Sequence, residues 1–173
     1  MKNSTKRIDK LVTQLPIPRP WNRTTFVDNV ATLRGRPITL ISTADLELPV
    51  TPDSACGIWL MRDSEDVIIY EAATSEYHID QIVCHELGHM LLGHMLLDHD
   101  RAADTSEGAR APDPLLHSAF PDLDPATVRA VLGRSDYGDR LEREAETFAT
   151  LVMVAVTADR PSQGLRNVLF RQQ

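Results

Sequence analysis

The sequence predicts an α+β fold in which a small mixed or antiparallel sheet is surrounded by helices. Two observations support this prediction. Segments with apolar residues at helical spacing stand near both ends of the chain and in its middle, and short runs rich in β-branched residues lie between them. The length of 173 residues suits one domain that buries a core without disulfides. We therefore expect residues 1–173 to form a single domain.

The N-terminal segment, residues 1–36, is predicted to be helical. Apolar residues recur at helical spacing over residues 4–15, and three prolines then end that helix. A second helix is expected from Asn22, a good capping residue, to the residue before Gly35. The segment carries eight Lys or Arg against two Asp. Two helices with solvated charges are favoured over a surface for nucleic acid or for an acidic partner.

Strands are expected over residues 38–42, 55–61 and 66–71, which are short apolar runs separated by polar or proline-containing segments, the first of them rich in β-branched residues. The polar residues 62–65 join the last two strands into a hairpin, and the proline-containing residues 44–54 are expected to form a loop. The hairpin stands directly before the central helix. It could therefore present an edge strand to an extended peptide.

The central helix, predicted over about residues 76–96, carries the H-E-x-x-H pattern at residues 85–89. In a helix His85 and His89 lie one turn apart on one face, so both imidazoles can reach a single cation. Glu86 follows the first ligand and is placed to take a proton from metal-bound water. The helix is apolar around most of its circumference, which is typical of a buried helix. Buried histidines need polar partners, and a metal ion would supply them.

The composition changes after the central helix. Residues 98–114 are rich in Asp, Ala, Arg, Gly and Pro without apolar periodicity, so an exposed acidic loop is expected there. Asp124 followed by Pro125 is typical of a helix start and predicts a short helix that ends at Gly133. A final helix is expected over about residues 139–157.

This final helix offers candidates for a third metal ligand, which a catalytic zinc site needs beside two histidines. Glu142 and Glu146 share one face of the helix, whereas Glu144 points elsewhere, by about 160° from Glu146. The small residues Ala145 and Ala149 would allow a neighbouring helix to come close. Spacing alone leaves open which glutamate is the ligand, and whether the segment is only a solvated charged face.

Charge and hydropathy restrict the possible partners. From residue 37 onward the chain holds ten Lys or Arg against twenty-three Asp or Glu, within a net charge of −7. This acidic part is a poor surface for nucleic acid, so no direct nucleic-acid partner is expected. The basic N-terminus has no apolar run behind it, and no segment is apolar over the length of a membrane span. We therefore expect a cytoplasmic protein without membrane contact.

Three motifs stand together in this chain: H-E-x-x-H at residues 85–89, Leu-Gly-His at 92–94, and E-x-E-A-x-x-F-A at 142–149. With the Gly-Ile-Trp-Leu strand at 57–60, they resemble the ImmA/IrrE family of metallopeptidases over about residues 35–155. The resemblance implies a zincin-like fold, with the active-site helix packed on the small sheet, and one zinc ion per chain. It also implies a regulatory or toxin–antitoxin component that cleaves a helix-turn-helix transcriptional repressor.

The resemblance further implies roles for single residues. His85, His89 and Glu142 would be the zinc ligands, the last by analogy with zincins whose third ligand is the first acid of an E-x-x-x-D motif. Glu146 would accept a hydrogen bond from the ring of a ligating histidine, and Glu144 is the alternative ligand. Two features depart from the family. Its members usually carry Asp or Asn at the position of Glu146, and the acidic loop makes the interval between His89 and Glu142 long.

The expected activity is hydrolysis of a peptide bond. Glu86 would take the proton of the zinc-bound water and return it to the leaving amine. Four residues are candidates for stabilising the oxyanion: His94, His117, Tyr70 and Tyr137. His94 lies nine residues beyond His85, which favours a structural role for it. The alternative function is a metal-stabilised regulatory module that binds a repressor without cleaving it. The presence of Glu86 argues against that alternative.

Overall fold

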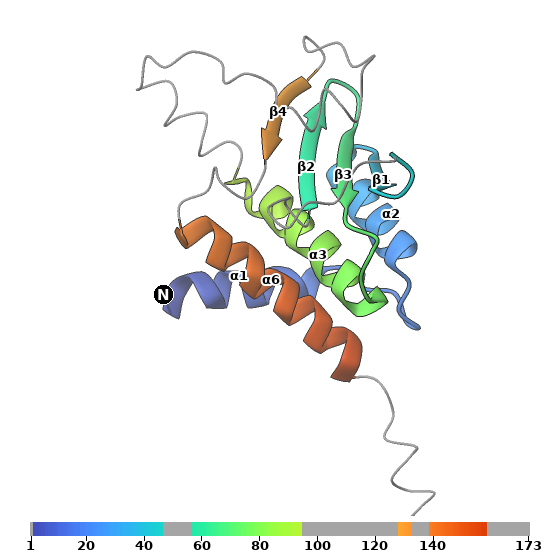
Figure 1. Ribbon diagram of the computed structural model, residues 1–173. Helices are drawn as coiled ribbons and strands as arrows, with labels where there is room; N and C mark the ends of the chain where they lie inside the picture. The colour runs from blue at the N-terminus through green and yellow to red at the C-terminus, as the bar shows by residue number, and fades with distance from the viewer. Residues whose placement is uncertain (1, 47–56, 95–127, 133–138, 159–173) are drawn as a thin grey trace, which may run out of the picture.

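The computed structural model describes residues 2–46, 57–94, 128–132 and 139–158 (Figure 1). The predicted α+β class is confirmed, and the predicted loop over residues 98–114 lies outside the described residues. In chain order the elements are α1 (Lys2–Gln14), α2 (Arg23–Arg34), β1 (Ile38–Ser42), β2 (Gly57–Arg62), β3 (Asp66–Tyr70), α3 (Glu76–Leu92), β4 (Val128–Leu132) and α6 (Asp139–Ala158).

The sheet is mixed and has four strands in the order β1-β3-β2-β4. β1 runs parallel to β3, with Ile38 opposite Asp66. β2 runs antiparallel to both β3 and β4. The hairpin strand β2 therefore lies inside the sheet, and the edge strand expected from the hairpin is covered by β4.

Residues 128–132, predicted as part of a short helix, form strand β4 instead. In its register Val131 lies opposite Leu60 and Leu132 opposite Trp59 of β2. A short helix gains little from its own hydrogen bonds because its nucleus is costly to form. Pairing with β2 gives the same backbone groups partners from an existing strand, and valines suit an extended backbone. The helix prediction is wrong for residues 128–132, because local periodicity cannot foresee a long-range pairing, and the first residues of that predicted helix lie outside the described residues.

The N-terminal helices follow the predicted pattern. In α1 the apolar positions Ile8 and Val12 are buried. The side chain of Asn22 caps α2 by accepting a hydrogen bond from a backbone N–H of its first turn, and Gly35 ends α2 with a left-handed φ of 66°. In the described residues no helix combines the length and the apolar character that crossing a membrane requires.

The central helix α3 ends earlier than predicted. It begins after Ser75, whose side chain caps its first turn. It ends at Leu92 because Gly93 adopts a left-handed conformation with φ 73° and donates its N–H to the carbonyl of His89. A straight helix would have carried His94 onward along the same axis. The turn at Gly93 redirects it.

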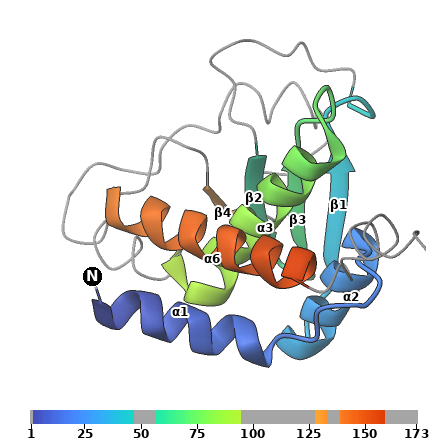
Figure 2. The same cartoon turned by 90° about the horizontal axis from the view of Figure 1, so that it is seen from below.

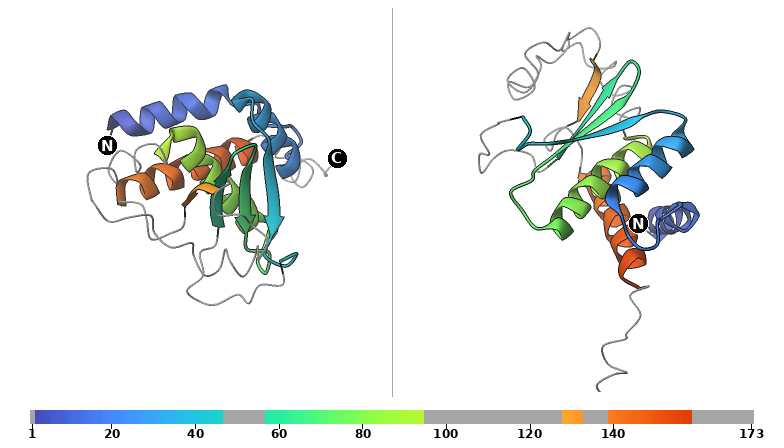
Figure 3. Two further views of the ribbon diagram at one scale, coloured as in Figure 1. Left: turned by 90° about the horizontal axis from the view of Figure 1, so that it is seen from above. Right: turned by 90° about the vertical axis from the view of Figure 1, so that its right-hand side faces the viewer.

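The four helices of the described residues lie on the same side of the sheet (Figures 2 and 3). α3 packs against β2 and β3 on one side and against α6 on the other, and α1 packs against α6. At Gly88 a Cβ would stand only 3.2 Å from the Cα of Ala145, so the small residues do permit the close approach predicted for them. Between sheet and helices the largest buried side chains of the core include Phe26, Trp59, Ile68, Leu87, Phe148 and Val152.

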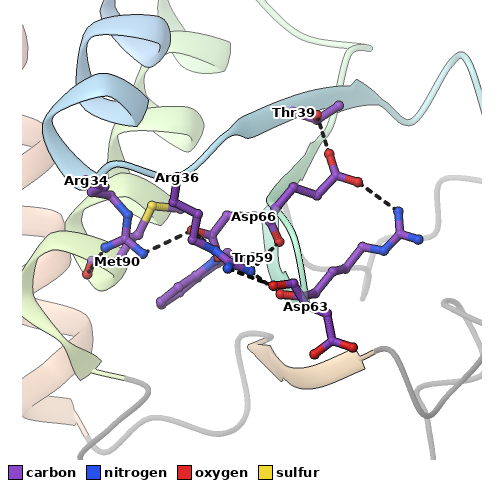
Figure 4. Close-up of polar contacts among 9 residues, drawn as sticks. Arg34, Arg36, Thr39, Trp59, Asp63, Asp66 and Met90 are labelled. Atoms are coloured by element: carbon purple, nitrogen blue, oxygen red, sulfur yellow. Dashed lines mark hydrogen bonds and ion pairs between the residues drawn. The ribbon is translucent and has the colours of Figure 1, made fainter.

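A buried ionic cluster joins α2, the sheet and the end of α3 (Figure 4). The fully buried Asp66 lies 3.0 Å from a guanidinium nitrogen of Arg34 and 3.2 Å from Nε of Arg36. Its other oxygen accepts a hydrogen bond from the indole N–H of Trp59 at 3.2 Å. Arg34 also donates to the carbonyl of Met90 in the last turn of α3. These contacts tie the C-terminal end of α3 to the sheet.

Candidate metal centre

The crossing of α3 and α6 brings three of the predicted metal ligands together. His85 and His89 lie one turn apart on α3, and their Nε2 atoms are 2.9 Å from one another. Glu142, in the first turn of α6, places one oxygen 3.4 Å from Nε2 of His85 and the other 3.6 Å from Nε2 of His89. One ligand atom from each residue lies within 4.8 Å of the others, so the group could hold a metal ion.

The separations within this cluster suit a small divalent cation. Tetrahedral ligands at about 2.0–2.1 Å from zinc stand about 3.3 Å from each other, and the three observed separations are 2.9, 3.4 and 3.6 Å. The His89 side chain is 1% exposed, whereas the side chains of His85 and Glu142 are 25% and 23% exposed. The cluster is therefore enclosed by protein beside His89 and reached by solvent beside the other two residues.

The protonation state of His89 also suits a metal ligand. Burial lowers its pKa to about 2, with a further contribution from the neighbouring rings of His85 and His94. His89 is thus neutral at pH 7, and one of its two ring nitrogens carries the lone pair that a metal ion would need. Imidazole nitrogens and a carboxylate are a donor set that divalent transition metals bind well.

Glu86 lies beside the cluster and is buried, with 6% of its surface exposed. Burial, followed by the charge of Glu142, raises the pKa of Glu86 to about 8. The start of β2 leaves room for this carboxyl group, since a Cβ at Gly57 would stand 2.7 Å from its Oε1. A carboxyl group whose pKa lies close to the pH of the solution can both accept and return a proton, which suits a group beside a cation site.

His94 connects the cluster to a second acidic residue. It is fully buried, and its Nδ1 lies 3.0 Å from Nδ1 of His89. On the far side of its ring, Nε2 lies 3.5 Å from Oε2 of Glu144. The ring of His94 therefore stands between a predicted ligand and a carboxylate, which is compatible with the structural role predicted for it.

Glu144, the alternative ligand, is not brought into the three-residue cluster. Two residues along a helix correspond to a rotation of about 200°, so it leaves α6 on a different side from Glu142. It accepts hydrogen bonds from Ser4 at 2.6 Å and from Arg140 at 3.0 Å. Although burial raises the pKa of Glu144, these hydrogen bonds and the one from His94 hold it below its usual value. Glu144 is therefore a carboxylate that accepts hydrogen bonds.

Glu146, expected to accept a hydrogen bond from a ligating histidine, is exposed instead. In the described part of the chain no hydrogen bond or ion pair joins it to His85 or His89. It lies one turn beyond Glu142, and its exposed side chain is not part of the cluster of His85, His89 and Glu142. The side-chain atom that faces Nδ1 of His89 is Nδ1 of His94, at 3.0 Å.

The four candidates for stabilising the oxyanion lie in different places. Tyr70 lies under the guanidinium of Arg23, whose carbon is 5.9 Å from the ring centre. His94 is buried behind His89, on the side of the cluster away from solvent. His117 and Tyr137 lie outside the described residues. Of the described candidates, His94 therefore lies behind a predicted ligand, and the role of Tyr70 stays a prediction.

The sequence interpretation missed the contribution of α1. Ser4 donates to Glu144 across 140 positions of the chain, and a guanidinium nitrogen of Arg7 lies 3.7 Å from the same carboxylate. No local pattern could have indicated these contacts, because they depend on how α1 packs against α6.

Comparisons of the chain with protein-family models, with curated proteins and with solved structures find no match.

Proposed function

We propose that the protein is a zinc-dependent endopeptidase of the ImmA/IrrE type. The observation that carries the proposal is the placement of Glu86, a buried carboxyl group beside a cluster formed by His85, His89 and Glu142. Three protein ligands with one side open to solvent are typical of catalytic zinc, whereas structural zinc sites are closed by four. A site that only stabilises the fold would have no use for a proton acceptor beside the ligands.

The residues of the cluster would divide the chemistry between them. His85, His89 and Glu142 would hold the zinc ion, which when bound lowers the pKa of water and polarises a carbonyl group. Glu86 takes up the proton released beside it and later returns it to the leaving nitrogen of the peptide. Glycine at position 57 leaves the space that this carboxyl group occupies, because a Cβ there would stand 2.7 Å from Oε1 of Glu86.

The proposed substrate is a helix-turn-helix repressor, the class that the family resemblance implies. The charge of the chain supports a partner of this kind. From residue 37 onward, acidic residues outnumber basic ones by twenty-three to ten, and a DNA-binding protein presents a basic surface. Opposite charges raise the rate of encounter between two such proteins.

The experiment that tests the proposal is the Glu86→Gln substitution. It keeps the ligands and the side-chain volume but removes the proton acceptor. We expect the variant to retain about one equivalent of zinc and to lose about 10²- to 10⁴-fold in cleavage of a peptide library. Glu146→Gln, which removes an exposed carboxylate one turn from Glu142, is the matched control and should cleave as the wild type does.

Two results would contradict the proposal. If Glu86→Gln cleaved peptides at the rate of the wild type, Glu86 would not be the base. If the wild type bound zinc but cleaved neither the library nor a repressor, the alternative of a metal-stabilised regulatory module would be supported instead.

A further inference from the structure

We propose that His94 and Glu144 are positioning residues for the metal ligand His89, and that helix α1 completes this support through Ser4. The inference rests on the proposed metal site, but it assigns roles to residues outside the ligand set. The geometry that carries it is a continuous line of polar contacts from His89 through His94 and Glu144 to the N-terminal helix.

The first step concerns the position of one proton. His89 can bind a cation through Nε2 only when that nitrogen carries a lone pair, which places the ring proton on Nδ1. That Nδ1 faces Nδ1 of His94 at 3.0 Å. Two ring nitrogens form a hydrogen bond only when one of them has the proton and the other does not. His94 must therefore accept at Nδ1.

The position of the proton on His89 also fixes the position of the proton on His94. A neutral His94 that accepts at Nδ1 carries its proton on Nε2, and Nε2 faces the Glu144 carboxylate at 3.5 Å. Each contact from Glu144 to His89 then joins a donor to an acceptor. The tautomer that this order selects for His89 is the one that binds a metal through Nε2.

Burial makes the arrangement restrictive. His89 is 1% exposed and His94 is 0% exposed. Their ring centres are 5.0 Å apart, and the ring planes stand nearly perpendicular at 77°. Buried polar groups are costly unless they are paired, so rotation of the His89 ring away from His94 would carry a free-energy penalty. The ring is thereby kept in the orientation that aims Nε2 at His85 and Glu142.

Helix α1 fixes the far end of the line. It packs against α6 (Figure 2), and the Ser4 hydroxyl donates to Oε1 of Glu144 at 2.6 Å. Arg140 donates to the same oxygen from the preceding turn of α6, and Arg7 approaches the other oxygen at 3.7 Å. These contacts hold the carboxylate of Glu144 in place beside Nε2 of His94. The basic N-terminal helix thus supports the metal centre through the hydrogen bond from Ser4 to Glu144.

The test measures metal binding, independently of cleavage. Zinc affinity is determined by competition with a chromophoric chelator, and the visible absorption of the Co²⁺-substituted protein reports the ligand geometry. His94→Phe fills the site without polar atoms and should weaken zinc binding about 10- to 100-fold. His94→Gln supplies an amide oxygen that accepts and an amide N–H that donates, so it should restore most of the affinity and of the Co²⁺ spectrum.

A matched pair of hydroxyl deletions tests the part played by α1. Ser4→Ala removes the hydrogen bond to Glu144 and should weaken zinc binding about three- to tenfold. Thr13→Ala removes a hydroxyl that donates only to the carbonyl of Lys10 within α1, and zinc binding should not change. Equal affinities for both variants would overturn the role of α1.

Other outcomes are equally decisive. Unchanged zinc affinity in a folded His94→Phe, or equal losses in His94→Phe and His94→Gln, would overturn the role of His94. If His94→Phe does not fold, imidazole ¹⁵N shifts of the zinc-loaded wild type decide, because an Nδ1–H tautomer at His94 would overturn the proposal and an Nε2–H tautomer would support it. A wild type that binds neither Zn²⁺ nor Co²⁺ would contradict the proposed function itself, and this inference with it.

Discussion

Two buried polar clusters lie against the C-terminal half of α3, and they are built in opposite ways. Around Asp66, one carboxylate meets the guanidinium groups of Arg34 and Arg36 and the indole N–H of Trp59. Around His89, the groups that come together are the ring nitrogens of His85 and His89 and the carboxylate of Glu142. The cluster around Asp66 contains two cationic groups, the guanidinium groups of Arg34 and Arg36. The cluster around His89 consists of nitrogen and oxygen atoms that could bind a metal cation.

The difference suggests separate roles for the two clusters, stability for the one around Asp66 and the proposed metal binding for the one around His89. Burying charge is costly unless opposite charges and hydrogen bonds compensate for it. The Asp66 cluster achieves this compensation with protein groups, so its expected role is to hold the sheet to α2 and α3. The cluster at the α3–α6 crossing could hold a metal ion, which under the proposed function would supply the compensating charge. Stability and metal binding should therefore respond to different substitutions.

The largest expected effect is stabilisation by zinc. A ligand at about 1,000 times its dissociation constant stabilises the folded state by about 4 kcal/mol, which corresponds to a rise of about 10 °C in Tm for a chain of this size. Differential scanning calorimetry with zinc and then with excess chelator measures the effect. His85→Ala should abolish the rise. A rise of the same size in that variant would show that zinc binds elsewhere.

The Asp66→Asn substitution should have the next largest effect. It leaves two guanidinium groups without their shared carboxylate, and we expect a loss of about 2–3 kcal/mol in the free energy of unfolding. This is less than is typical of a wholly buried ion pair, since the arginine side chains are 23% and 25% exposed. Urea denaturation measures the loss. Zinc affinity should stay at the wild-type value, and a parallel fall in affinity would mean that the two clusters are coupled.

A pair of glycine substitutions should have the smallest effect on stability, but the two variants should differ clearly in zinc affinity. Gly35 and Gly93 both end helices with a positive φ, 66° and 73°, and a Cβ would meet no atom within 4 Å at either. Alanine should therefore cost about 1 kcal/mol at each position. Only Gly93 directs His94 toward His89, so only Gly93→Ala should weaken zinc binding. Equal zinc affinities in the two variants would contradict the importance of that turn.

The parts of the fold that could be predicted from sequence are those with local causes. Asn22, Ser75 and Gly35 mark helix ends through contacts with residues close in the chain. The spacing of His85 and His89 is likewise local, because one helical turn brings them together.

The remaining features depend on long-range packing. Strand β4 exists through its pairing with β2. The exposed position of Glu146, and the contacts of Glu144 with Ser4 and Arg7, depend on how α6 packs against α3 and α1. The place of His94 could not be read from a helical wheel, because the left-handed Gly93 interrupts the helix one residue earlier.

The most direct test of the metal centre is the zinc content and affinity of Glu142→Ala beside Glu146→Ala. Both substitutions remove a carboxylate from the same face of α6, but only Glu142 lies within the cluster. We expect about one zinc per wild-type chain, unchanged affinity in Glu146→Ala, and a loss of more than about 100-fold in Glu142→Ala. Equal zinc binding by Glu142→Ala and the wild type, or no zinc in the reconstituted wild type, would contradict the account.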